Sequence, residues 1–163
     1  MRPIEVLFFV FFSVFGFTAD ITVGNGSEDD FSNIQSAFDF AKNGDTILVK
    51  AGEYKISEPL NFNRLRNPAD PDLSTVKNLR LLGGPNVIVR MSDIPADTAR
   101  ASVVIFENGE TQLSVISGFV ITGGSGTLHG NFQIGGGIFC KDSSPRITQC
   151  EIRENTLVKG DKF

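Results

Sequence analysis

Two cysteines carry the most reactive side chains in this sequence, and both lie near its carboxyl end. Cys140 and Cys150 stand in the stretch GGGIFCKDSSPRITQCEIREN, residues 135–155. Two thiolates cannot complete a four-ligand zinc site. Strand alternation predicts that both point inward, together with Ile138 and Ile152. Two states are open: buried free thiols, which pack as small apolar groups, and a disulfide, which needs Cα atoms within about 7 Å.

A set of charged residues on separate strands forms a second candidate site. Alternation places Lys50, Glu107 and Lys141 on the outside, where they could share one column. Cleavage of an acidic polysaccharide uses such groups, because cations neutralise the uronate while a base removes the α-proton. The same residues could equally form a surface charge ladder, which contributes little energy.

Three aspartates lie in segments that are too rich in Pro and Asp to form strands. Asp70 and Asp72 belong to residues 61–77, and Asp93 belongs to residues 93–100. Loop carboxylates can ligate calcium, but the spacing of these three does not match a calcium loop. We interpret them as solvated turn residues and predict no metal site.

Few other residues suggest chemistry. His129 is the only histidine, and its Gly-rich surroundings predict a surface residue. Asn25-Gly26-Ser27 fits a glycosylation sequon, which matters only in a eukaryotic secretory route. The sequence contains no phosphate-binding loop, nucleophile elbow or Cys-His pair. We therefore assign no catalytic residue and predict no cofactor.

Composition limits the class of protein. With 163 residues, 40% of them hydrophobic and 21% charged, the chain can form one globular domain with a core. The formal net charge of −4 leaves no basic stripe for phosphate, so nucleic acid is excluded as an expected partner.

The first nineteen residues have the features of a secretory signal peptide. Arg2 precedes an apolar run from Val6 to Phe17, which is too short for the roughly 20 residues of a membrane-spanning helix. We predict a cleaved signal peptide over residues 1–19 and a secreted or cell-surface protein with no membrane span after cleavage. The alternatives are an uncleaved anchor or a buried N-terminal helix.

The remaining chain begins with one short helix and continues as β-structure. Apolar residues at helical spacing predict a helix after Phe31, with Ser32 as its N-cap and Gly44 as its terminator. Its apolar stripe comprises Ile34, Ala37, Phe38 and Ala41. The predicted strands are residues 21–23, 46–49, 79–82, 87–89, 103–106, 113–122, 138–140 and 147–152.

Self-similarity in the second half of the chain indicates how these strands are arranged. ISGFVITGGSGTL, residues 116–128, aligns with ITQCEIRENTL, residues 147–157, so that Ile116 meets Ile147 and Phe119 meets Cys150. Units this small bury their faces only by stacking on one another as parallel coils. Asn108-Gly109 is also a hairpin signal, so an antiparallel sandwich is the alternative fold.

The stretches GDTILVKAGEY, SGFVITGG and GGGIFCKDSSPRITQCEIREN resemble the right-handed parallel β-helix superfamily of pectin-lyase-like proteins. More narrowly, they are similar to secreted bacterial repeat proteins with coils like those of polymorphic outer-membrane proteins. The resemblance covers the chain from Ile21 onward and implies an all-β parallel β-helix with a short capping helix at its N-terminal end. It implies little about function, because the superfamily includes lyases, hydrolases, epimerases, adhesins and spacers.

We therefore expect residues 20–163 to be the N-terminal, truncated part of a parallel β-helix domain, because the last unit stops where glycines should open another coil. The expected function is a structural, adhesive or glycan-interaction module. The alternative is the N-terminal part of a polysaccharide lyase or related carbohydrate-active enzyme acting on acidic polysaccharide. The expected partner is an extracellular polysaccharide or cell-surface glycan, and we expect a monomer.

Overall fold

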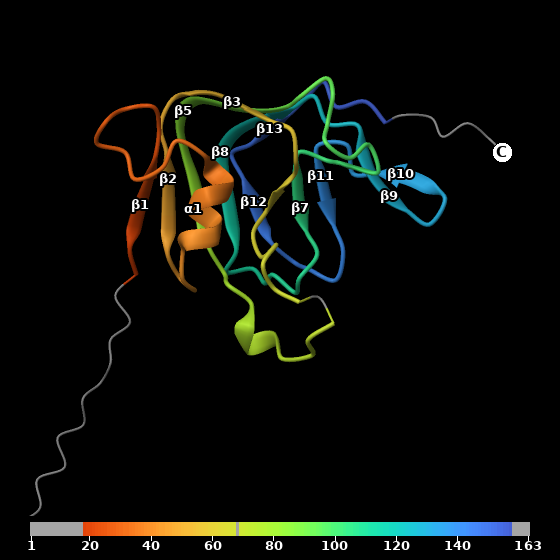
Figure 1. The fold of residues 1–163 in the computed structure, drawn as a ribbon, viewed down its shortest axis with the longest axis horizontal. Helices are drawn as coiled ribbons and strands as arrows, with labels where there is room; N and C mark the ends of the chain where they lie inside the picture. The colour runs from red at the N-terminus through yellow and green to blue at the C-terminus, as the bar shows by residue number, and fades with distance from the viewer. Residues whose placement is uncertain (1–17, 68, 158–163) are drawn as a thin grey trace, which may run out of the picture.

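The chain folds as a parallel β-solenoid of about three turns (Figure 1). The computed structural model describes residues 18–67 and 69–157. The predicted signal peptide, residues 1–19, thus lies almost entirely outside the described residues. The helices are α1 (Ile34–Phe40) and the 3₁₀ turn η1 (Leu73–Thr75). The strands are β1 (Asp20–Val23), β2 (Thr46–Val49), β3 (Gly52–Ile56), β4 (Leu60–Asn61), β5 (Arg80–Met91), β6 (Arg100–Ala101), β7 (Val104–Phe106), β8 (Val115–Thr122), β9 (Gly126–His129), β10 (Phe132–Ile134), β11 (Ile138–Cys140), β12 (Arg146–Thr148) and β13 (Glu151–Ile152).

The largest sheet, called sheet A here, runs along the whole solenoid in the order β1-β2-β5-β8-β12. All its strand pairs are parallel, with β3 beside the second half of β5 and β13 beside the second half of β8. Ile116 pairs with Ile147, and Ile121 pairs with Ile152, which confirms the register predicted from the repeat. The alternative antiparallel sandwich is wrong, because β7 and β8 belong to different sheets and Gly109 turns the corner between them at φ 84°.

Two smaller sheets complete the coils. Sheet B contains β4, β7 and β11 in parallel, and sheet C is an antiparallel sheet of β6, β9 and β10. The β9–β10 hairpin projects from the side of the solenoid in Figure 1. The sequence pattern does not predict this hairpin, because residues 123–137 are too rich in glycine to display a strand pattern.

One predicted pair of strands proves to be a single strand. Both predicted strands, residues 79–82 and 87–89, fall within β5 apart from Leu79, which directly precedes it, and the register of β5 against β8 shifts between Leu82 and Val87. At the shift, Gly83 packs against Gly118, whose φ is 84°. A Cβ on Gly118 would lie only 2.4 Å from the carbonyl oxygen of Gly83. Glycine at both positions therefore allows the two coils to approach.

Helix α1 closes the N-terminal end of the solenoid, where it contacts β1, β2 and β4 (Figure 1). The predicted apolar stripe is buried, as its four members are 0–3% exposed. The predicted cap is wrong by one residue: Asn33, not Ser32, accepts a hydrogen bond from the Ser36 amide. Helix α1 also ends at Phe40, before Gly44, because Ala41 already has extended backbone angles.

Aromatic rings connect this helix to the coils behind it. The ring centroids of Phe38 and Phe62 are 4.4 Å apart, and those of Phe62 and Phe106 are 4.6 Å apart. All three side chains are at most 1% exposed. This row joins α1, the segment after β4 and β7, so that the cap and the first two coils share one core.

Candidate functional site

The two cysteines are free thiols at the C-terminal end of the solenoid. Cys140 is in register with the buried Phe106, which agrees with the predicted inward direction. The predicted burial is wrong, because Cys140 is exposed and Cys150 is half-buried. No further coil covers them among the described residues. Burial of part of the side chain, and the nearby Glu110 carboxylate, raise the pKa of the Cys140 thiol.

The predicted column of Lys50, Glu107 and Lys141 does not form. Lys50 follows a strand of sheet A and pairs with Asp29 at 2.6 Å, whereas the other two residues follow strands of sheet B. Glu107 instead pairs with Arg100 at 2.5 Å. The error has a simple cause: alternation predicts which side chains point outward, but it does not predict the sheet to which each strand belongs.

The three candidate calcium ligands are turn residues with structural partners. Asp72 caps η1 by accepting the Ser74 amide, and hydrogen bonds from the Ser74 side chain and backbone lower the pKa of Asp72. Asp70 accepts the Asp72 amide, and Asp93 pairs with Arg90 at 3.2 Å. Among the residues that the structure describes, no group of three His, Cys, Asp or Glu side chains is placed to hold a metal ion.

The remaining two sequence features lie on the surface. His129 is exposed at the end of β9, with its ring centroid 6.2 Å from that of Phe139. Asn25-Gly26-Ser27 forms an exposed turn after β1. The turn is held by Asp29, whose carboxylate accepts the Gly26 amide at 2.8 Å.

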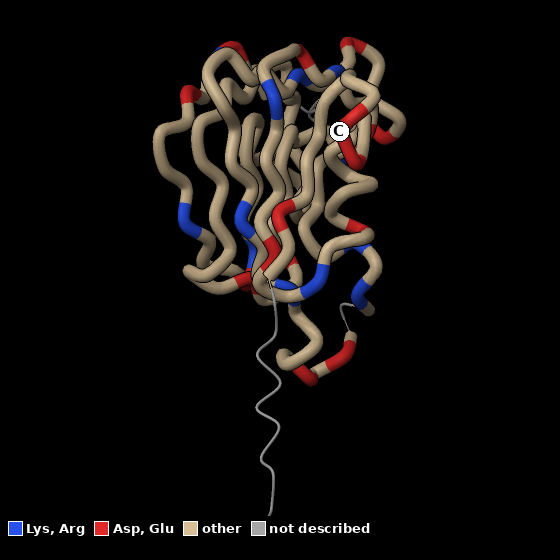
Figure 2. Tube along the Cα trace, turned by 90° about the vertical axis from the view of Figure 1, so that its left-hand side faces the viewer, with Lys and Arg blue, Asp and Glu red and all other residues tan. Residues whose placement is uncertain are grey.

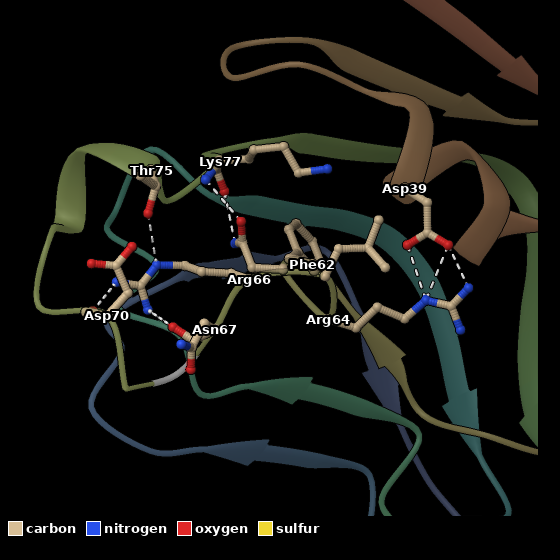
Figure 3. A pocket seen from close by; sticks show the side chains of 10 residues that line it. Asp39, Phe62, Arg64, Arg66, Asn67, Asp70, Thr75 and Lys77 are labelled. Carbon is tan, nitrogen blue, oxygen red and sulfur yellow. Dashed lines mark hydrogen bonds and ion pairs between the residues drawn. The ribbon is translucent and has the colours of Figure 1, made fainter.

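A pocket of about 300 Å³ lies between α1 and the long loop that follows β4 (Figure 3). Its cations are already engaged. Arg64 forms a two-pronged pair with Asp39 of α1. Lys77 donates to the carbonyl oxygens of Phe38 at 2.6 Å and Ala41 at 3.1 Å, and burial lowers the pKa of its ammonium group. These contacts fasten the loop to the end of the helix.

Arg66 holds the loop itself in shape. Its guanidinium donates to the Thr75 hydroxyl and to the backbone carbonyls of Asn67 and Asp70 (Figure 3). It also donates to the backbone carbonyl of Asp72. A guanidinium with this many protein acceptors has few donors left for a ligand. The pocket is therefore better explained as a structural junction than as a binding site.

Buried polar groups also join successive coils at one corner. Glu110 is 1% exposed, and its carboxylate accepts hydrogen bonds from the Asn63 side chain at 2.9 Å, the Asn108 amide at 2.9 Å and the Ser143 hydroxyl at 2.8 Å. These three donors come from three different coils. Because every carboxylate oxygen has a partner, the network stabilises the stack and leaves no reactive group free.

The outer face of sheet A carries a different arrangement. A shallow groove of about 410 Å³ crosses β5, β8 and β12. Arg80 and Arg146 are both register partners of Val115, one on each side of it. Two rungs of a parallel ladder put them about 9–10 Å apart along the solenoid axis. The groove is lined by Arg80, Leu82, Gln112, Leu113, Val115, Ser117, Arg146 and Thr148, a set with two cations and no carboxylate.

Arg80 and Arg146 differ from the other described arginines in what surrounds their guanidinium groups. Acidic and basic residues alternate in many places along the chain trace in Figure 2. Arg64, Arg90, Arg100 and Arg153 each pair with a carboxylate, and Arg66 binds loop carbonyls. Within residues 18–67 and 69–157, neither Arg80 nor Arg146 has an ion-pair or side-chain hydrogen-bond partner, and both are exposed.

Arg80 and Arg146 are not among the site residues predicted from the sequence. A signal was present, because Val115 and Arg146 directly precede Ile116 and Ile147, which the repeat alignment had already matched. Arg80 could not be found in that way, because its coil carries the irregularity in β5 and does not share the repeat.

The fold thus defines the chain as a parallel β-solenoid protein with an arginine-bearing groove on its longest sheet. Comparisons with protein-family models, curated proteins and solved structures found no match. The narrower resemblance to pectin-lyase-like and polymorphic-outer-membrane repeat proteins therefore has no support from a matched relative. No helix among the described residues is long and apolar enough to cross a membrane.

Proposed function

We propose that this protein is an exported β-solenoid module that binds an acidic polysaccharide along the outer face of sheet A. The observation that carries the proposal is the pair of guanidiniums of Arg80 and Arg146, which have no ion-pair or side-chain hydrogen-bond partner in the described part of the chain and lie in a groove whose described lining holds no carboxylate. Export rests on the N-terminal apolar segment, and the glycan class rests on the groove together with the resemblance of the coils to secreted β-helix proteins.

The geometry suits an extended polymer. The rungs of a parallel ladder repeat every 4.8 Å or so, and a chain lying along the solenoid axis would cross one rung after another. Guanidinium groups bind carboxylates through two parallel hydrogen bonds, which would fix acidic sugars at Arg80 and Arg146. Leu82 and Val115 offer apolar surface to the faces of sugar rings, and Ser117 offers a hydroxyl to their hydroxyl groups.

The experiment is retention of the full chain on immobilised polyuronate, with a neutral polysaccharide column as the reference. We expect the chain to be retained on the polyuronate column and not on the neutral column. Added salt should weaken this retention, because it screens exposed charge pairs. R80Q and R146Q should each weaken binding about tenfold, the amount expected when one charge-assisted hydrogen-bonding group is lost. The matched control is R153Q, because Arg153 lies in the same coil as Arg146 but already contacts Glu151 and Glu154 at 3.0 Å.

The outcomes separate the competing ideas. Absence of retention would refute the binding proposal, and retention that R80Q and R146Q leave unchanged would refute the assigned site. The same samples can be followed for the ultraviolet absorbance of unsaturated sugars. Its appearance would identify the alternative, a polysaccharide lyase, because β-elimination leaves a carbon–carbon double bond in the product.

A further inference from the structure

The outer face of sheet A presents its side chains in files that run along the solenoid axis. One of them, called the arginine file here, consists of register partners on β1, β2, β5, β8 and β12: Asp20, Thr46, Arg80, Val115 and Arg146. The file faces outward, because the next residue along each of the first four strands is at most 3% exposed. Its members follow one another at about 4.8 Å, the distance between parallel strands.

The groove is apolar between its two arginines. Val115 occupies the rung between Arg80 and Arg146, and Leu113, in the turn before β8, lines the groove beside it with 72% of its side chain exposed. Neither side chain can donate a hydrogen bond. A carboxylate held against them would lose water without gaining a partner. Along the solenoid axis, the groove therefore presents a cation, an apolar rung and a second cation.

This order of side chains matches a particular order of sugars. In an extended polysaccharide, one linked pyranose ring covers a length of roughly the 4.8 Å of one rung. Sugars that lie over Arg80 and Arg146 are therefore separated by one intervening sugar. That sugar meets Val115 and Leu113, which suit the apolar face of a neutral ring and not a carboxylate. A chain that alternates acidic and neutral sugars is thus complementary to the groove at all three rungs.

We propose that the groove selects a polysaccharide of alternating acidic and neutral sugars, and that Arg80 and Arg146 bind the two acids of one acid–neutral–acid unit. This inference rests on the proposed function and names the class of polymer that the same groove prefers. The two guanidiniums stand on one sheet, so a ligand bound to the first presents its next acid to the second at a high effective concentration. A polymer of uronate alone can bind through alternate carboxylates, but the carboxylate between them must be desolvated or reoriented.

The first test compares two trisaccharides by titration calorimetry with the full chain: glucuronate–glucose–glucuronate, and three glucuronates with the same linkage. We expect the first to bind at least about threefold tighter, although it carries one negative charge fewer. L113K should reverse this preference, because a lysine supplies the middle carboxylate with a partner. L65K is the matched control and should keep it, because Leu65 is also exposed, at 71%, but lies on the loop after β4 and not in the groove. Far-ultraviolet circular dichroism should show the same fold for all three proteins.

The second test extends the arginine file. Asp20 is exposed on β1, two rungs beyond Arg80, where the next acid of an alternating chain would lie. D20R should therefore bind an alternating pentasaccharide of glucuronate and glucose, with glucuronate at both ends, about tenfold tighter than wild type. The trisaccharide should gain only about twofold, because it acquires a second equivalent position and no further contact. T46R is the matched control: its new cation would stand one rung from Arg80, opposite a neutral sugar, so the pentasaccharide should gain much less than in D20R.

The outcomes separate this inference from the proposed function. If neither trisaccharide binds and polyuronate does not retain the chain, the proposed function itself is refuted. If uronates bind but the two trisaccharides have equal affinity, or L113K leaves their order unchanged, the selection for alternating sugars is refuted. Equal gains of the pentasaccharide in D20R and T46R would also overturn it, because the spacing of the cations would then not matter.

Discussion

Replacing Phe62 with alanine tests whether the helix and the first two coils share one core. Phe62 is 1% exposed and lies between Phe38 and Phe106, with ring centroids 4.4 and 4.6 Å away. Truncating a fully buried phenylalanine costs about 3–5 kcal/mol through lost burial and the cavity left behind. We therefore expect F62A to lower the free energy of unfolding in urea by that amount. F132A is the control and should cost less than about 0.5 kcal/mol, because Phe132 is 73% exposed.

A double-mutant cycle makes the same test more specific. Paired aromatic rings contribute about 0.5–1.5 kcal/mol beyond the area that they bury. F62A and F106A should therefore show a coupling free energy of about 1 kcal/mol, measured from the urea midpoints of both single variants and the double variant. The reasoning is refuted if F62A costs less than about 1 kcal/mol, or if the two substitutions are additive, because the rings would then not be in contact.

Three further predictions concern the backbone and two charged groups. G118A should lower the free energy of unfolding in urea by well over 1 kcal/mol, because Gly118 has positive φ and its new Cβ would meet a carbonyl oxygen. G130A is the control: Gly130 also has positive φ, but a Cβ there would meet no atom within 4 Å, so this variant should cost only about 1 kcal/mol. Lys50 and a backbone amide lower the pKa of Asp29, so its stabilisation is present above about pH 4 and is lost as pH falls through the lower folded pKa. D29N should be less stable than wild type at pH 7, and this difference should shrink as the pH falls below about 4. Burial lowers the pKa of Lys77, so the unfolded chain holds that proton more tightly, and stability rises with pH between the lowered folded pKa and the ordinary lysine value of about 10.4. Wild type should therefore gain stability relative to K77M as pH rises toward that value, and a constant difference would contradict this.

The repeat was enough to predict the architecture. The 31-residue offset between Ile116 and Ile147 predicts the register of the parallel strands, because coils that stack must place equivalent residues one above the other. The amphipathic stripe from Ile34 to Ala41 likewise predicted the helix that closes the N-terminal end. Both features depend on patterns that persist over several residues and on a face that must be buried.

Two features could not be predicted in this way: the shortest strands, and the sheet to which each strand belongs. Strands β4 and β6 have two residues each, which is too few to show alternation. The incorrect column of Lys50, Glu107 and Lys141 arose because a period of two gives the side of a strand but not its sheet. Cys140 and Cys150 were predicted to be buried because the pattern gives direction, whereas burial requires another layer above them.

Hydrogen-bond scalar couplings measured by NMR would test the parallel stack most directly. The structure places backbone hydrogen bonds from Arg80 to Asp45, from Val115 to Leu79 and from Arg146 to Ser114, with N···O distances of 2.8–3.0 Å. We predict couplings between the amide nitrogen of the first residue and the carbonyl carbon of the second in all three pairs. Coupling of the Val115 amide to a carbonyl of residues 101–103, as a hairpin at Asn108-Gly109 would give, would contradict the parallel coils and the binding groove built on them.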